Sequence, residues 1–227
     1  MSLNIIYEDK ELIVCEKPAG VPSQGDKSMA VDMISKLKTY LYEKEGTANA
    51  YIAGVHRLDR PVGGVMVFAK NKNAAADLSR QIRDHETNKR YYAIVQGMLP
   101  LTEEAVRVED YLLQDPKTNT SKVVKQGTKD AKEAVLLYTP VRHVVIEGET
   151  CTVLDVQLLT GRHHQIRVQL GEHFGGIWGD TKYNDNFKKK RGFFKIALYS
   201  YFLSFTHPKT KKAVSFEQEP TAFPFSC

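Results

Sequence analysis

The sequence predicts an α+β fold with mostly antiparallel strands. Two stretches have the apolar spacing of amphipathic helices, and several shorter apolar runs have the length of strands. Between residues 105 and 158, turn signals separate the apolar runs without intervening helical patterns. Parallel strands need long crossover connections, so we expect mostly antiparallel pairing. With 227 residues the chain is long enough for a sizeable core, and we expect a single domain over 1–227.

The strand predictions begin with a hairpin at the N-terminus. Two apolar runs, 5–7 and 12–15, are separated by four charged residues. Continuous apolar runs at 65–69 and 91–95 predict buried strands. A closing hairpin is expected from 197–205 and 213–216, joined through Pro208-Lys209-Thr210. Turns within 105–158 are expected at Asp115-Pro116, Gly127 and Glu147-Gly148.

Three helices are predicted. The first runs from a cap at Ser28 to a stop at Gly46, with apolar residues at helical spacing between them. The second covers 73–84, with an apolar side at Ala74, Leu78 and Ile82. A short third helix is expected over 163–170, because Ile166 and Leu170 are spaced i, i+4 after Gly161.

Composition excludes several classes of protein. The three cysteines, Cys15, Cys151 and Cys227, are odd in number and lack Cys-x-x-Cys spacing, which argues against a disulfide framework and a zinc site. The N-terminus lacks the features of a signal peptide, and no run has the length of a membrane helix. We therefore expect a cytoplasmic protein. The net charge of +5 permits a polyanionic partner without requiring one.

The first reactive segment is His56-Arg57-Leu58-Asp59-Arg60, which immediately precedes the predicted strand at 65–69. The neighbouring arginines are expected to keep Asp59 ionised, so it could act as a nucleophile or a base. A surface cluster of salt bridges is the alternative interpretation. The segment alone does not decide between them.

The second reactive segment, Gly161 to Arg167, favours the catalytic interpretation. Arg162 and Arg167 supply planar guanidinium groups suited to a carboxylate or a phosphate. His163 and His164 are adjacent and are expected to point in different directions, and no metal-ligand spacing accompanies them. We predict no metal site, and we expect His56 and His164 to position loops or phosphates.

Two tyrosines follow Lys89-Arg90 on a predicted strand. Tyr91 and Tyr92 alternate, so one should face the core and the other a cleft or solvent. The pattern leaves open whether either one does more than pack. A lysine run at 188–191, flanked by aromatic residues, leaves RNA or DNA contact open as well.

Taken as a set, these residues resemble the RluA-type family of pseudouridine synthases, which isomerise uridine to pseudouridine in RNA. Five blocks occur in the family's order along nearly the whole chain: Glu16–Gly20, His56–Arg60, Lys89–Gly97, Leu159–Arg167 and Gly179–Tyr183. The resemblance implies a pseudouridine synthase fold, with a mixed, largely antiparallel central sheet flanked by helices and loops and a central active-site cleft. It implies a reaction without cofactor or metal. It also implies a stand-alone catalytic domain without the small N-terminal RNA-binding domain of some relatives.

The resemblance carries three roles onto this sequence. Asp59 matches the family's catalytic aspartate, Tyr91 the tyrosine that packs on the target base, and Arg167 the arginine paired with the aspartate. Charge and position lead us to expect RNA contacts from Arg57, Arg60, Arg162 and the 188–191 run.

The sequence departs from the family's pattern at three places. Pro61-Val62-Gly63 follows the aspartate where Asp-Thr-Ser is common, His163 stands where Thr or Ser is usual, and Gln169 where His is frequent. None of these departures removes Asp59, Tyr91 or Arg167.

The leading hypothesis is therefore a monomeric RNA pseudouridine synthase acting on rRNA or tRNA. Its first alternative is a non-catalytic RNA-binding or RNA-chaperone module on the same fold. A second alternative is a glycosidase with a carboxylate pair, but neither motif contains a suitable second acid.

Overall fold

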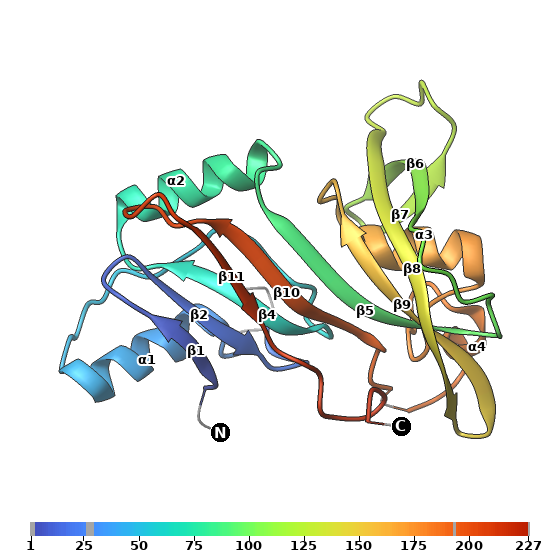
Figure 1. Ribbon diagram of the computed structural model, residues 1–227, viewed down its shortest axis with the longest axis horizontal. Helices are drawn as coiled ribbons and strands as arrows, with labels where there is room; N and C mark the ends of the chain where they lie inside the picture. Colours follow the sequence, from blue (N-terminus) through green and yellow to red (C-terminus); the bar gives the residue numbers. More distant parts are fainter. Residues whose placement is uncertain (1–2, 26–29, 193, 227) are drawn as a thin grey trace. The chain divides into compact units, whose positions relative to one another are not determined.

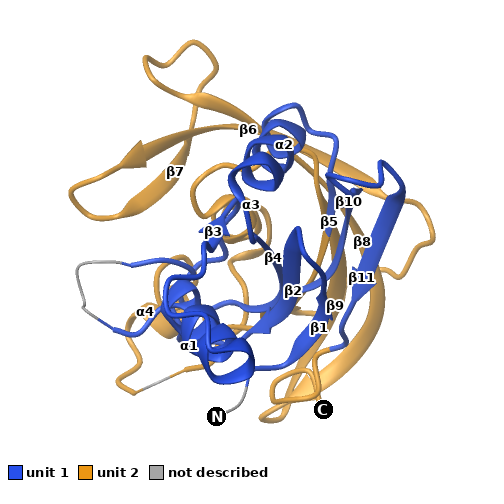
Figure 2. Cartoon of the chain, turned by 90° about the vertical axis from the view of Figure 1, so that its left-hand side faces the viewer, with its two compact units in different colours: residues 1–89, 200–219 blue, residues 90–199, 220–227 orange. Residues whose placement is uncertain are grey.

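The computed structural model describes residues 3–25, 30–192 and 194–226 (Figure 1). The chain separates into two compact units, coloured in Figure 2. Unit 1 contains residues 1–89 and 200–219, and unit 2 contains 90–199 and 220–227. The chain passes from one unit to the other within strands β5 (Asn88–Gln96) and β10 (Leu198–Thr206). The single domain expected over 1–227 stays a prediction.

Unit 1 is built on the strand order β1-β2-β4-β10, with β11 beside β10 and the short β3 beside β4. The pairs β1 with β2, β2 with β4, β3 with β4 and β10 with β11 are all antiparallel. The bounds of these strands are β1 Ile5–Glu8, β2 Leu12–Lys17, β3 Ala53–Gly54, β4 Gly63–Ala69 and β11 Ala213–Glu217. Both predicted hairpins of this unit are confirmed.

Strand β4 forms the centre of the core of unit 1. All seven of its residues are buried, as its unbroken apolar sequence predicts for a strand covered on both faces. Val65, Val67 and Ala69 pack with side chains of β2 and β10 and with Ala74 and Leu78 of α2 (Lys72–Arg83). Helix α1 (Met33–Glu45) buries Met33, Leu37 and Leu41. The fold thus brings a rigid strand to the end of the loop that carries Asp59.

Unit 2 is an antiparallel sheet in the order β5-β9-β8-β6-β7. Its remaining strands are β6 Val106–Asp115, β7 Thr120–Val124, β8 Lys132–Ile146 and β9 Glu149–Leu158. Helix α3 (Gln165–Phe174) packs against β6 and β7, where Val168 joins Leu112 and Ala134 in a small core. A single turn of helix, α4 (Asp185–Lys188), follows.

The predicted α+β class with a largely antiparallel sheet is confirmed, and the differences lie at helix starts. Helix α1 begins at Met33, where the Asp32 carboxylate accepts from the Ser35 N–H at 2.8 Å. Ser28, the predicted cap, lies outside the described residues. Helix α3 begins two residues later than predicted and continues to Phe174.

Three elements differ in length from what the sequence pattern indicates. Strand β8 is 15 residues long, although short strands were expected there. Strand β3 and helix α4 are not predicted, because two and four residues are too few to show a period. Among the described residues, no helix combines the length and the apolar character needed to cross a membrane.

Candidate active site

In unit 1 the loop between β3 and β4 carries Asp59, and its backbone is held on both sides of that residue. On the N-terminal side, the Ser23 hydroxyl donates to the Leu58 carbonyl at 2.8 Å and accepts from the Leu58 N–H at 3.1 Å. On the other side, the Val62 N–H donates to the Asp59 carbonyl at 2.9 Å. Leu58 is buried, whereas Asp59 is half-buried. The loop therefore fixes the carboxylate without enclosing it.

A buried lysine supports the same loop. The Lys17 side chain has no exposed surface, and its ammonium donates to the carbonyls of Pro18 at 3.1 Å, Val21 at 2.7 Å and Arg60 at 3.2 Å. Burial lowers the pKa of Lys17 to about 7, while the charge of Asp59 acts in the opposite direction. The protonated form of Lys17 is thus within electrostatic range of Asp59.

Sequence reasoning did not assign Lys17 a role, although it lies in the first family block. The available signal was its position at the end of the apolar strand β2, directly before Pro18. A lysine is almost never fully buried unless its charge has partners. Without the fold, nothing indicated that the carbonyl of Arg60 would be one of them.

The two arginines beside Asp59 are both exposed. Arg60 is anchored to Gly20: its Nε donates to the Gly20 carbonyl at 3.0 Å, and the Gly20 N–H donates to the Arg60 carbonyl at 2.7 Å. Gly20 has φ +88°, a conformation that favours glycine. Both arginines that flank Asp59 in the sequence are therefore at the surface, and their contact with RNA stays a prediction.

His56 is attached to β4. Its Nε2 accepts a hydrogen bond from the Val67 N–H at 3.1 Å, so this nitrogen carries no proton. Burial lowers the pKa of His56 to about 3, and the charge of Lys89 acts in the same direction. A neutral His56 thus attaches this loop to β4, and its role in positioning loops or phosphates stays a prediction.

In unit 2, Tyr91 lies on β5 opposite Val156 of β9 and is buried, whereas Tyr92 is half-buried. The alternation predicted for the two side chains is therefore visible in their burial. Arg90, directly before Tyr91, forms an ion pair with Asp155 across the same strand pair. This pair holds the end of β5 that carries Tyr91.

Arg167 lies in the first turn of α3 and has a carboxylate partner within unit 2. Its Nε donates to one oxygen of Asp180 and its Nη2 to the other, both at 2.8 Å. The side chains are 5% and 0% exposed, so this is a buried bidentate ion pair. The pairing of Arg167 with Asp59 implied by the family resemblance joins residues of the two units and stays a prediction.

Asp180 lies in the last family block, but the sequence alone predicts no function for it. Its carboxylate also accepts from the backbone N–H of Lys182 at 2.8 Å and of Tyr183 at 3.3 Å. Gly179 before it has φ +78°, and a Cβ there would lie 2.2 Å from the Lys195 carbonyl oxygen. Residue 179 must therefore be glycine for the backbone to turn here, and Asp180 after it orients Arg167.

The rings of the two adjacent histidines lie side by side. The prediction that they point in different directions is therefore wrong. Their rings stack with centroids 3.8 Å apart, because His164 has φ 54° in the left-handed region. His163 hydrogen-bonds to Ser121 of β7 at 2.9 Å and to Asn119 at 3.1 Å. His164 hydrogen-bonds to the hydroxyl of Tyr183 at 2.7 Å. Both histidines thus connect the start of α3 to other segments of unit 2.

The remaining predicted RNA contacts also lie in unit 2. The Nε of Arg162 donates to the Glu133 carbonyl at 2.7 Å. The side chains of Lys188 to Arg191 are exposed. Lys188 pairs with Asp185, and the Lys190 ammonium lies 4.6 Å from the centre of the Phe187 ring. Among the described residues, no group of three or more His, Cys, Asp or Glu side chains could hold a metal ion.

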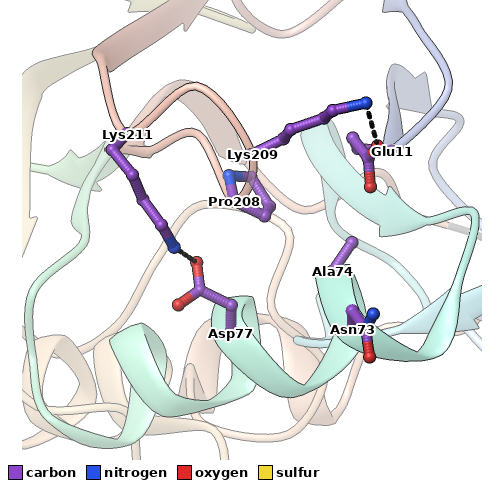
Figure 3. A pocket seen from close by; sticks show the side chains of 7 residues that line it. All are labelled: Glu11, Asn73, Ala74, Asp77, Pro208, Lys209 and Lys211. Atoms are coloured by element: carbon purple, nitrogen blue, oxygen red, sulfur yellow. Dashed lines mark hydrogen bonds and ion pairs between the residues drawn. The ribbon is translucent and has the colours of Figure 1, made fainter.

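A separate depression of about 380 Å³ lies in unit 1, between the start of α2 and the turn before β11 (Figure 3). Lys209 pairs with Glu11 at 3.6 Å and Lys211 with Asp77 at 3.4 Å, so two ion pairs line it. None of the predicted site residues lines this depression.

Residues 11–172 match the protein family described as RNA pseudouridylate synthase. The chain is 32% identical to tRNA pseudouridine synthase C of Haemophilus ducreyi, over 95% of this chain and 90% of that protein. It is 34% identical to ribosomal large subunit pseudouridine synthase D of Neisseria meningitidis, over 96% of this chain and 58% of that protein.

The fold is similar as well. The solved structure of human RNA Pseudouridylate Synthase Domain Containing 4 superposes with a TM-score of 0.75 over 95% of this chain and 88% of that one, at 23% identity. This likeness confirms the pseudouridine synthase fold. The family match covers most of the chain, including the segments of Asp59, Tyr91 and Arg167. The chain therefore belongs to the RNA pseudouridylate synthase family, enzymes that isomerise uridine to pseudouridine in RNA.

Proposed function

We propose that this enzyme modifies uridine in a structured rRNA or tRNA and that Asp59 is its essential carboxylate. The proposal about the RNA is supported by its relatives, one named for tRNA and the other for the large ribosomal subunit. The proposal about Asp59 is carried by one observation. Its loop is fixed through Leu58, Asp59 and Arg60, while the carboxylate itself is half-buried.

The reaction is a rearrangement without net addition or loss of atoms. The C1′–N1 bond breaks, the detached uracil turns, and a C1′–C5 bond forms; C5 loses a proton and N1 gains one. In one route the Asp59 carboxylate attacks C1′ and is later displaced by C5. In the other route Asp59 removes the C2′ proton of the ribose as uracil leaves, which gives a glycal, and a proton returns to C2′ when the C1′–C5 bond forms. Both routes require Asp59 ionised and oriented.

The other site residues have distinct roles in this proposal. Arg167 orients the Asp59 carboxylate, and the bidentate contact with Asp180 keeps the Arg167 guanidinium in one orientation. Tyr91 packs on the extruded base, which offsets part of the cost of unstacking it. Arg57, Arg60, Arg162 and the 188–191 run contact RNA phosphates, and His56 and His164 position the segments around them.

We further propose that the enzyme works as a monomer in the cytoplasm. Light scattering during gel filtration would give one chain per particle. A dimer that persists at nanomolar concentration would contradict this part of the proposal.

The proposed RNA class is tested by mapping pseudouridine in total RNA of cells with and without the gene, and by treating the unmodified RNA with purified enzyme. We expect at least one uridine in rRNA or tRNA to lose its modification without the gene and regain it in vitro. Complementation with Asp59→Asn should leave that position unmodified. Identical maps from both cells would contradict the proposed substrate, and binding without turnover would favour the non-catalytic RNA-binding alternative.

A further inference from the structure

Tyr183 lies where three parts of unit 2 meet. Its ring is beside the Arg167 guanidinium, whose central carbon is 5.2 Å from the ring centre. Its hydroxyl is 2.7 Å from Nδ1 of His164, the residue before α3, and 2.9 Å from the backbone nitrogen of Ser121 in β7. The ring and the hydroxyl thus contact different structural elements.

The ring completes the support of Arg167. Asp180 holds the edge of the guanidinium, and the aromatic face of Tyr183 is available for a cation–π contact with it. Close packing keeps Tyr183 in place: a Cβ on Gly171 of α3 would lie 3.1 Å from the Tyr183 carbonyl oxygen and 3.3 Å from its Cβ. The ring also packs against the small core of Leu112, Ala134 and Val168.

The hydroxyl connects α3 to the β6–β7 hairpin (106–124). The Ser121 N–H donates to the Tyr183 oxygen, and the hydroxyl hydrogen can be donated to His164. Three further contacts reach the same hairpin: His163 contacts Ser121 and Asn119, and the Lys182 ammonium donates to the Asn119 carbonyl at 2.8 Å. The turn of the hairpin is therefore tied to the segments on either side of α3.

Four exposed lysines lie on the hairpin and just after it, although residues 106–124 as a whole have no net charge. Lys117 and Lys122 are exposed on the hairpin, and Lys125 and Lys129 are exposed in the loop that follows. Lysines at the surface contribute to RNA affinity through the phosphates. A hairpin held in one position relative to α3 can bring these lysines to the RNA at lower entropic cost than a mobile one.

We propose that Tyr183 is a positioning residue with two separable functions. Its ring orients Arg167 for the chemical step, and its hydroxyl holds the lysine-bearing β6–β7 hairpin for RNA binding. The inference rests on the proposed function, because it takes Arg167 as the group that acts on Asp59.

The two functions are separated by two substitutions, measured as kcat and KM on one RNA substrate. Tyr183→Phe keeps the ring and removes the hydroxyl, so KM should rise about fivefold, the effect of one hydrogen bond, with kcat unchanged. Tyr183→Leu removes the ring as well, so kcat should also fall about tenfold or more. The recovery of kcat from Leu to Phe is the result that a merely structural role would not give.

Two matched controls lie in the same unit. Tyr111→Phe removes a hydroxyl of the same hairpin, which accepts from Gln126 of the following loop at 2.9 Å, and it should leave KM unchanged. Tyr138→Leu removes a ring packed edge-on against Phe174 at the far end of α3, with centroids 5.1 Å apart, and it should leave kcat unchanged. Thermal unfolding of each variant identifies the temperature at which all of them are folded, and kinetics are compared there.

Three results would overturn the inference. The first is equal kcat for Tyr183→Leu and wild type while Arg167→Ala is inactive. The second is equal loss of kcat in the Phe and Leu variants. The third, full activity of Arg167→Ala, would refute the proposed role of Arg167 itself, so the two kinds of failure are distinguishable.

Discussion

Individual charged residues in this protein gain their function from partners that are distant in the sequence. Arg167 is oriented by Asp180, thirteen residues away. Lys17 contacts the loop of Asp59 by donating a hydrogen bond to the Arg60 carbonyl. Residue type and motif predict which side chains are reactive, and these roles stay predictions. They do not predict Lys17 or Asp180 as supporting residues, because those contacts depend on the fold.

The buried pair of Arg167 and Asp180 provides a test at this scale. Asp180→Ala leaves a buried guanidinium without its bidentate partner, so the free energy of unfolding should fall by about 3–5 kcal/mol. Urea denaturation measures this loss. As a control, Asp185→Ala removes a carboxylate that pairs with Lys188 but is 84% exposed. This variant should leave the urea concentration at the midpoint of unfolding unchanged. Similar midpoints for the two variants would contradict the structural account of Arg167.

His56 predicts a dependence of stability on pH. Its pKa is lowered from 6.5 to about 3 in the folded protein, so below pH 6.5 the unfolded chain binds a proton that the folded chain does not. The stability due to a neutral His56 is therefore present above pH 6.5 and is lost as the pH falls toward 3. The loss should be on the order of 1 kcal/mol per pH unit within this range.

This prediction is checked with His56→Gln, whose side-chain oxygen can still accept from the Val67 N–H. The variant should be less stable than wild type at pH 7, and the difference should shrink as the pH falls from 6.5 to 3. A difference in the free energy of unfolding that stays constant over this range would show that His56 does not titrate as described.

At the scale of elements, backbone packing requires glycine at the start of β4. Gly64 has φ +127°, and a Cβ on it would lie 2.2 Å from the Ser200 carbonyl oxygen of β10 and 2.6 Å from the Ser200 nitrogen. The glycine thus allows β10 to approach the end of the strand that follows the Asp59 loop. The apolar run predicts this strand correctly. Nothing in the sequence shows that Gly64 is needed for close packing and not merely for a turn.

Gly64→Ala should therefore destabilise the protein by more than the cost of a positive φ. We expect a loss of about 3 kcal/mol or more in the free energy of unfolding, since backbone must move to relieve the overlap. Gly97→Ala has a similar φ of +95° with nothing within 4 Å of its Cβ, so it should cost only about 1–2 kcal/mol. Chemical denaturation compares the two. Equal losses would show that β10 yields easily at this point.

The elements that the sequence predicted well have a long, regular pattern. Strand β4 is apolar throughout, and α2 has Ala74 and Leu78 on its buried side. The start of α3 was predicted two residues early, because His164 before it has the left-handed conformation, which is uncommon for a residue other than glycine. The capping residue of α1 was also displaced, to Asp32.

At the scale of the whole molecule, the similarity to known pseudouridine synthases extends over nearly the whole chain and is not confined to single residues. The enzyme carries a net charge of +5, and exposed basic side chains occur in both units, as in Arg57 and Lys190. Association with RNA should therefore weaken as salt is added.

A phosphate contact from Arg57 would appear in that salt dependence. Arg57→Ala should weaken RNA binding and lower the slope of log affinity against log salt concentration by about 0.7–0.9. Titrations between low and physiological salt measure the slope, with Lys38→Ala on the exposed side of α1 as the control. An unchanged slope for Arg57→Ala would remove Arg57 from the proposed RNA contacts.

The central claim is that the Asp59 carboxylate performs the reaction. The most direct test is single-turnover formation of pseudouridine in the target RNA by Asp59→Asn, beside Asp84→Asn, which neutralises a carboxylate at the end of α2. We expect the rate of Asp59→Asn to fall about a thousandfold or more with folding and RNA binding retained, and that of Asp84→Asn to match wild type. Turnover by Asp59→Asn within tenfold of wild type would contradict the account.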